Sequence, residues 1–210
     1  MFWLGVLLFV PAWSLDFWQA WIFALIVLAS SSLIIVYLLK RDPKLIERRL
    51  KWGPAAEKER SQKTIQALLR IIIIALIAVP GLDHRFRWSH VPPSLVLVAD
   101  LFVALGYFIL FFVFRENSFA SAVIEISPGQ SVVSTGPYRL VRHPMYSGAL
   151  LMLLFVPLAL GSFWSLAFVP PMFAVILWRL LDEERFLSKN LPGYDEYRRR
   201  TRYRLAPGIW

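Results

Sequence analysis

Cysteine is absent from this sequence, and its absence removes several kinds of chemistry. A chain without thiols forms no disulfide, no thiolate metal site and no cysteine nucleophile. Histidine is scarce as well: His84, His90 and His143 lie far apart and outside any HExxH-like spacing. We therefore expect no metal centre. Internal repeats and low-complexity tracts are also lacking, and the 210 residues leave room for one domain, residues 1–210.

Acidic residues are few relative to basic ones, with 14 Asp and Glu against 23 Lys and Arg and a formal charge of +9. A basic balance of this size can indicate a nucleic-acid partner. Here, however, the cations stand beside long apolar runs. The enrichment of Lys and Arg in cytoplasmic loops of membrane proteins explains that placement more simply. We therefore expect membrane lipids, and no nucleic acid, as partners.

Apolar residues make up 58% of the chain, and long apolar runs predict an all-α, polytopic integral membrane bundle. The segment Met1–Trp13 would be only ~18 Å long as a helix, so it is either a tilted short span or an interfacial segment. The bundle then has five or six transmembrane spans. The expected spans are Phe17–Leu39, a helix with the apolar core Ala67–Val79 that ends at Pro80-Gly81, Ser94–Phe114, Tyr146–Leu160 and Phe163–Leu181.

Loop charge predicts which side of the membrane each loop occupies. The segment Lys40–Lys63 and the tail Arg185–Arg204 are rich in Lys and Arg, whereas Gly81–Pro93 is nearly balanced and the turn at Gly161-Ser162 is uncharged. By the positive-inside rule, the basic loop, the region Arg115–Met145 and the tail lie in the cytoplasm. The absence of cysteine and the net charge of +9 favour a prokaryotic source, and hence a prokaryotic cytoplasmic membrane.

The stretch Arg41–Gly53, "RDPKLIERRLKWG", favours an amphipathic helix on the membrane surface over a solvated basic loop. Asp42 would be its N-cap and Pro43 its first helical residue. Residues alone assign this stretch no chemistry.

Polar residues that are unusual beside a membrane span form a first candidate element, Ser134–Gly148, "STGPYRLVRHPMYSG". Pro144 is well placed at a helix start and disfavours helix at His143, so His143 is expected to cap the span with its side chain aimed at the membrane surface. Free backbone N–H groups at that helix start suit an anion, to which Arg142 would add a fixed charge.

A second element, Trp178–Phe186, "WRLLDEERF", places Arg179 one helical turn before Glu183. Because Arg179 follows a long apolar run, it lies at or below the interface, where ionisable groups are costly and favour a functional interpretation. The alternative is that Arg179 snorkels to water. A third element is the tail Gly193–Trp210, in which Tyr194 and Tyr197 would share a helix face, although interfacial aromatics are the ordinary interpretation.

These three elements together resemble the isoprenylcysteine carboxyl methyltransferase family, which is related to the membrane phospholipid methyltransferases. The resemblance rests on "GPYRLVRHPMYSG", an apolar hairpin, "EERFL" and "YDEYRRR", and covers roughly Gln130–Trp210 and, more loosely, "RDPKLIERR" near the first basic loop, as in bacterial members. It implies an integral-membrane, S-adenosylmethionine-dependent methyltransferase with N-terminal spans in residues 1–114. The cofactor-binding core would be residues 115–210, with its site facing the cytoplasm.

The resemblance also implies roles for individual residues. Arg179 would orient the substrate carboxylate, and Arg179, Glu183 and Arg142 would be the catalytic set. Met145 replaces a serine common in eukaryotic members, a change of little consequence if the contact is made by the backbone. The residues implied to contact the cofactor are Gln130, Ser131, Val132, Val133, Tyr138, His143, Pro144, Met145, Tyr146 and Glu183.

The methyl acceptor is expected to be a lipophilic small molecule or lipid-linked group. A carboxylate needs no general base, whereas an amine or thiol acceptor would lose a proton to Glu183, Glu184 or His143. Two other classes stay open. One is an NADPH-dependent, sterol-reductase-like enzyme, suggested by the ending "YRLAPGIW". The other is a non-catalytic membrane module or small transporter, disfavoured because the polar groups gather at one end of the spans.

Overall fold

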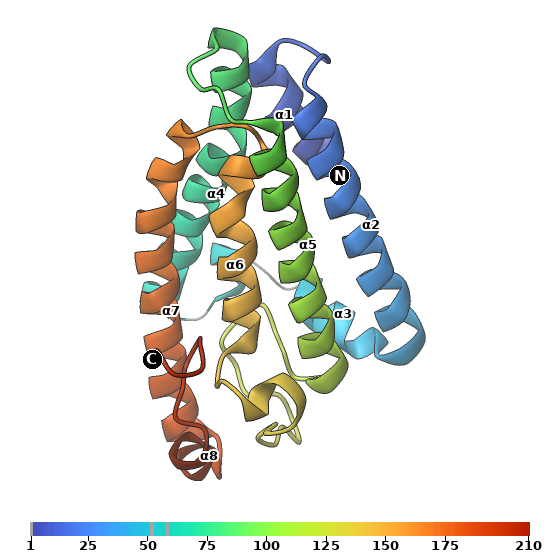
Figure 1. Ribbon diagram of the computed structural model, residues 1–210. Coiled ribbons are helices and arrows are strands. Elements are labelled where there is room, and N and C mark those ends of the chain that lie inside the picture. The colour runs from blue at the N-terminus through green and yellow to red at the C-terminus, as the bar shows by residue number, and fades with distance from the viewer. Residues whose placement is uncertain (1, 51–52, 58) are drawn as a thin grey trace.

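The computed structural model describes residues 2–50, 53–57 and 59–210 and contains helices and loops without strands in these ranges (Figure 1). The all-α prediction is therefore confirmed. The helices are α1 (Phe2–Ala12), α2 (Trp18–Arg41), α3 (Pro43–Leu50), α4 (Arg60–Phe86), α5 (Pro93–Glu116), α6 (Pro144–Ala159), α7 (Val169–Asn190) and α8 (Tyr194–Arg200), with short 3₁₀ turns at Pro54–Ala56, Gly136–Arg139 and Trp164–Phe168.

The long helices expose apolar side chains to their surroundings. Four segments are long and apolar enough to cross a membrane: α2, α4, α5 and Trp164–Asn190. Only 11% of the most apolar window of α2 is buried inside the protein, and Leu25 and Leu33 are 66% and 71% exposed. An apolar helix surface that no protein covers is suited to lipid. The predicted polytopic membrane bundle is confirmed.

The shorter helices complete the bundle. α6 has 16 residues, yet Figure 1 shows it running beside α5 between the same two ends as the long helices. Together with α2, α4, α5 and α7 it gives the expected five crossing elements. α1 packs on α4 and occupies the upper part of the bundle in Figure 1. With 11 residues it is an apolar helix too short to be a candidate membrane span.

One predicted helix end is wrong. α4 does not end at Pro80-Gly81 but continues to Phe86. A Cβ on Gly81 would lie 2.8 Å from the Leu8 carbonyl oxygen, because the last turn of α1 packs directly against this point. Pro80 and Gly81 therefore mark a close helix–helix approach and not a turn. The last span is also longer than expected, since α7 runs to Asn190.

The surface helix predicted for Arg41–Gly53 forms as α3 over Pro43–Leu50, while Lys51 and Trp52 lie outside the described residues. Asp42 caps it as expected, because the Leu45 N–H donates to Asp42 Oδ1 at 3.1 Å. Leu45 is fully buried and Leu50 is 71% exposed, so one face of α3 packs on the bundle.

Two glycines let α5 and α6 approach closely. A Cβ on Gly106 would lie 2.8 Å from the Gly148 carbonyl oxygen, and one on Gly148 would lie 3.0 Å from Ile109 Cγ2. Small residues at matched positions bring helix backbones together in membranes. This contact fixes α6, and with it the polar residues at its start.

Buried acids in the spans have contrasting surroundings. Asp83, at the end of α4, accepts hydrogen bonds from the Ser89 and Ser162 hydroxyls, so it joins three segments at the upper end of the bundle in Figure 1. Asp100 in α5 is 3% exposed and its two carboxylate oxygens have no hydrogen-bond partner among the described residues.

Candidate functional site

A pocket opens at the basic end of the bundle, where the loop after α5, the start of α6, the end of α7 and α8 meet. The empty space between its lining residues, its open mouth included, is about 790 Å³. Its lining includes Gln130, Ser131, Val132, Val133, Tyr138, Arg142, His143, Met145, Tyr146 and Glu183. Of the residues that the resemblance assigns to the cofactor, Pro144 is the one that lies outside this lining.

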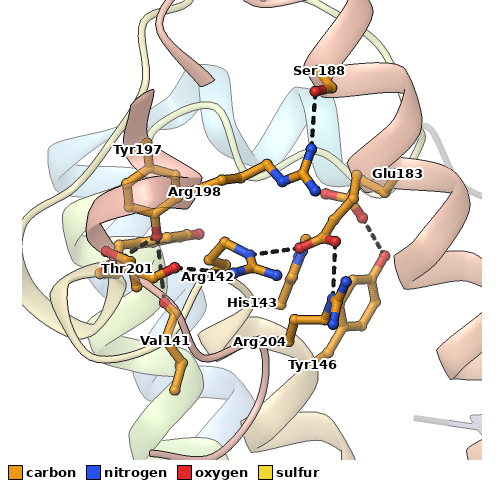
Figure 2. A network of polar contacts seen from close by, with 12 residues as sticks. Val141, Arg142, His143, Tyr146, Glu183, Ser188, Tyr197, Arg198, Thr201 and Arg204 are labelled. Atoms are coloured by element: carbon orange, nitrogen blue, oxygen red, sulfur yellow. Dashed lines mark hydrogen bonds and ion pairs between the residues drawn. The ribbon is translucent and has the colours of Figure 1, made fainter. Parts of the chain in front are cut away.

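Met145 and Tyr146, in the first turn of α6, line the pocket. Pro144 is the first helical residue and His143 the N-cap, as expected. The His143 side chain, however, makes no capping hydrogen bond and does not reach the membrane surface. It is 5% exposed, with Nε2 3.3 Å from Glu184 Oε1. Tyr146 donates its hydroxyl proton to Glu183 Oε2 at 2.5 Å, which joins α6 to α7 across the pocket (Figure 2).

Glu184 contacts three basic side chains next to the pocket. Its Oε1 accepts from Arg142 Nε at 2.6 Å and lies near His143, and its Oε2 accepts from Arg204 Nε at 2.9 Å. Glu184 is 4% exposed, so these charges are almost fully withdrawn from water. The cluster fastens the C-terminal tail to the two helices that form the site.

The Arg142 guanidinium forms its hydrogen bonds with other groups of the protein. Beyond Glu184, its Nη1 donates to the carbonyls of Thr201 and Arg202 at 3.0 and 2.7 Å (Figure 2). The backbone continues the pairing, since the N–H groups of Arg142 and His143 donate to the carbonyls of Tyr203 and Arg204. Arg142 therefore positions the tail, although it also lines the pocket.

An extended segment forms the opposite wall. After a turn at Gly129, the Gln130 side chain accepts from the Ser127 N–H at 2.9 Å, and the chain then runs extended through Val133. The backbone groups of residues 131–133 pair with no other backbone group in the described part of the chain. Unpaired N–H and C=O groups beside a pocket can bind a polar ligand.

Tyrosines from α8 and from the segment that precedes α6 line the remaining side of the pocket. Tyr194 and Tyr197 share one face of α8, as predicted, with ring centroids 6.0 Å apart. Tyr197 donates to the Tyr138 carbonyl at 2.8 Å, whereas the buried Tyr194 hydroxyl has no partner among the described residues. Burial raises the pKa of Tyr138 to about 12 and that of Tyr194 further, so both phenols keep their protons near neutral pH.

Arg179 lies outside this lining. Its Nη1 is 2.9 Å from Glu57 Oε1 and 2.8 Å from Gln62 Oε1, and its Nη2 donates to the Ala122 carbonyl at 2.8 Å. The side chain is 7% exposed, so it does not snorkel to water. Its acid partner is Glu57, which precedes α4, and not Glu183 one turn along its own helix.

Comparison with known proteins supplies a family for this region. Residues 95–192 match the family described as phospholipid methyltransferase. The match spans most of α5 and all of α6 and α7, and agrees with the resemblance read from the motifs. A methyltransferase domain within a polytopic helical bundle supports a membrane methyltransferase.

Two curated proteins are similar to the chain. The cobalt-zinc-cadmium resistance protein CzcN of Cupriavidus metallidurans is 32% identical over 139 residues, covering 63% of this chain and 59% of that protein. The Delta(14)-sterol reductase TM7SF2 of Mus musculus is 28% identical over 151 residues, covering 62% of this chain and 35% of that protein. The chain thus spans about a third to three fifths of these relatives' length.

Motif analysis missed three parts of the site. It gave Glu184 no structural role, treated Tyr194 as an interfacial aromatic, and did not include Asn117, whose side-chain amide donates to the Tyr138 hydroxyl at 2.8 Å. A signal for Glu184 was present in the sequence, because it forms a doubled acid with Glu183 in a chain that also carries the adjacent basic residues Arg142 and His143. Among the described residues no group of three or more His, Asp or Glu side chains forms a candidate metal site.

Proposed function

We propose that this protein is an integral-membrane, S-adenosylmethionine-dependent methyltransferase whose acceptor is lipophilic or membrane-partitioned. The observation that carries the proposal is the pocket. The family-related elements, separate in sequence, meet in one cavity at the basic end of a lipid-exposed bundle. An enzyme that joins a water-soluble cofactor to a lipid-like acceptor needs a site at this position.

The residues present fit the cofactor. Glu183 offers a carboxylate to its amine, and the start of α6, above the Arg142, His143 and Arg204 cluster, offers N–H groups and positive charge to its carboxylate. The unpartnered Tyr194 hydroxyl and the unpaired backbone of residues 131–133 supply donors and acceptors for its sugar and base. These roles follow the resemblance and the donor set.

The chain's part in the reaction is to align the reactants and exclude water. S-adenosylmethionine supplies an activated methyl group on a sulfonium, and its transfer to a carboxylate oxygen gives an ester and a neutral thioether. Tyr146 and Glu183, held together across α6 and α7, fix the cofactor side of the pocket. Apolar helices around the site keep water from the transfer. Among acceptors we favour a carboxylate of the isoprenylcysteine type, because Glu184 is already paired with Arg142 and Arg204 and is no free base.

A reductase that uses NADPH is the second candidate. It is supported by the similarity to a protein named Delta(14)-sterol reductase. The two candidates differ in the nucleotide that they bind, so ligand binding separates them.

Thermal unfolding in detergent is the direct comparison. We expect S-adenosylmethionine and S-adenosylhomocysteine to raise the unfolding temperature and NADPH to leave it unchanged. Glu183→Gln should weaken the cofactor affinity by about 10-fold or more, because it removes a charge-assisted hydrogen bond. The control Glu47→Gln, an exposed acid on α3, should bind normally. Stabilisation by NADPH and not by S-adenosylmethionine would favour the reductase.

A further inference from the structure

Arg49, on the surface helix α3, reaches to the edge of the pocket. Its Nη1 lies 3.3 Å from Met145 Sδ and 3.5 Å from the Ala120 carbonyl oxygen, and both of these residues line the pocket. The guanidinium carbon is 4.7 Å from the centre of the Phe114 ring. The Met145 side chain, and not only its backbone, is therefore part of the site, since it supports this arginine.

The other edge of the Arg49 guanidinium is free. The Nε and Nη2 groups make no hydrogen bond with the described residues, and no Asp or Glu among them forms an ion pair with Arg49. Burial lowers the pKa of this guanidinium, and the nearby Tyr146 and Tyr138 hydroxyls offset that effect in part. Arginine nevertheless remains charged. A partly buried cation without an acid partner has lost hydration that an anion would restore.

Two other arginines near the pocket are paired with acids: Arg142 with Glu184, and Arg179 with Glu57. Arg48, one residue before Arg49, donates to the Ser118 carbonyl, lies over the Phe119 ring and, like Arg49, forms no ion pair with a described residue. Arg49 differs from Arg142 and Arg179 because its Nε–Nη2 edge is available, and it differs from Arg48 because it contacts Met145 of the cofactor-site motif. Two parallel N–H groups on that edge match the two oxygens of a carboxylate.

We infer that Arg49 binds the carboxylate of the methyl acceptor and holds it beside Met145 at the mouth of the cofactor pocket. The inference rests on the proposed function and deepens it. α3 packs Leu45 on the bundle and exposes Leu50, so it lies where an acceptor with its apolar chain in lipid would present its polar end. Arg179, which the resemblance assigns to the substrate, forms an ion pair with Glu57, and its role toward the substrate stays a prediction.

The test uses the full chain in phosphatidylcholine nanodiscs, loaded with S-adenosylhomocysteine. The probe is N-acetyl-S-farnesylcysteine, a lipophilic carboxylate, and its carboxamide is the neutral match. Wild type should bind the acid more tightly than the amide. Arg49→Gln should weaken acid binding by about 10- to 100-fold and leave amide binding unchanged, since only the acid makes charge-assisted hydrogen bonds. Arg49→Lys should keep part of the preference, and Lys44→Ala, exposed on the same helix, should keep all of it.

Three outcomes overturn the inference. The first is equal binding of acid and amide by wild type. The second is an unchanged preference in Arg49→Gln, with Arg179→Gln losing it instead. The third is a loss of S-adenosylhomocysteine affinity in Arg49→Gln, which would make Arg49 part of the cofactor site. Failure of wild type to bind S-adenosylhomocysteine would instead remove the proposed function itself, and so the two failures are distinguishable.

Discussion

Glu183 and Glu184 are adjacent in the chain but serve different partners. Glu183 faces the pocket and accepts from Tyr146, whereas Glu184 turns away and balances Arg142, His143 and Arg204. One acid is thus available to a ligand, and the other is required by the protein. The doubled acid of the motif contains a binding residue and a structural residue.

Substituting these two acids should affect the stability of the protein differently. Glu184→Gln leaves the buried Arg142 and the partly exposed Arg204 without a counter-charge, and removing one partner of a buried ion pair destabilises by about 3–5 kcal/mol. We expect a markedly lower unfolding temperature in detergent and faster proteolysis of the tail after Arg202. Glu183→Gln should unfold at nearly the wild-type temperature. An unaffected Glu184→Gln protein would show that the cluster does not hold the tail.

The candidate site could be predicted from sequence only in part. The HPMY element, Glu183 and the Gln130–Val133 segment were found because local motifs carry them, and all of these residues except Pro144 line one pocket. The partners of Arg142 and Arg179 were not, because Glu184 and Glu57 are chosen by tertiary packing that no spacing reveals. For the same reason Arg49 received no chemistry until Met145 and Ala120 were found beside it.

At the scale of elements, α6 is positioned by its contact with α5. Gly106 and Gly148 face each other so closely that added carbons would overlap with backbone. Because His143 and Tyr146 stand at the start of α6, this contact sets the spacing of the pocket. The packing of two spans thus positions the candidate site at one of their ends.

Gly106→Val should therefore damage the site from a distance. The side chain must displace Met152 or the Gly148 backbone, at a cost of about 1–3 kcal/mol for overpacking. We expect a lower unfolding temperature and weaker S-adenosylhomocysteine binding, measured together by ligand-dependent thermal unfolding. Gly5→Val is the matched control, since nothing lies within 4 Å of a Cβ there. Equal behaviour of the two variants would contradict the close approach of α5 and α6.

Sequence patterns predicted the elements better than their ends. Hydrophobic length correctly gave the crossing helices α2, α4, α5, α6 and α7. Pro80-Gly81 nevertheless misled, because local turn chemistry could not show that α1 would cover Gly81. Helix ends that depend on a neighbouring element are set by tertiary contacts, and a single-sequence pattern does not contain them.

At the scale of the whole molecule, the segments richest in Lys and Arg lie at one end of the bundle. The basic loop, the segment after α5 and the tail gather at the end that holds the pocket, at the bottom of Figure 1, and the opposite end carries exposed Trp13, Trp88 and Trp164. The positive-inside rule then orients the pocket toward the cytoplasm. This orientation is a prediction.

The absence of cysteine makes that orientation easy to measure, because single cysteines can be added without removing any. Ser134→Cys, near the pocket, should react with a membrane-impermeant thiol reagent only in inside-out vesicles. Asp16→Cys, in the exposed loop at the other end, should react only in right-side-out vesicles. The reverse pattern would place the pocket outside the cytoplasm, away from the cofactor.

Methyl transfer itself is the most direct test of the central claim. Membranes containing the protein would be incubated with S-adenosylmethionine labelled in its methyl group, and the organic extract would be counted and its labelled product identified. We predict label in a lipophilic product for wild type, and loss of at least about 90% of that label in Glu183→Gln, given a 10-fold or greater weakening of cofactor binding at limiting cofactor. Wild-type membranes with no more label than membranes lacking the protein, alongside NADPH-dependent reduction of a lipid, would contradict a methyltransferase.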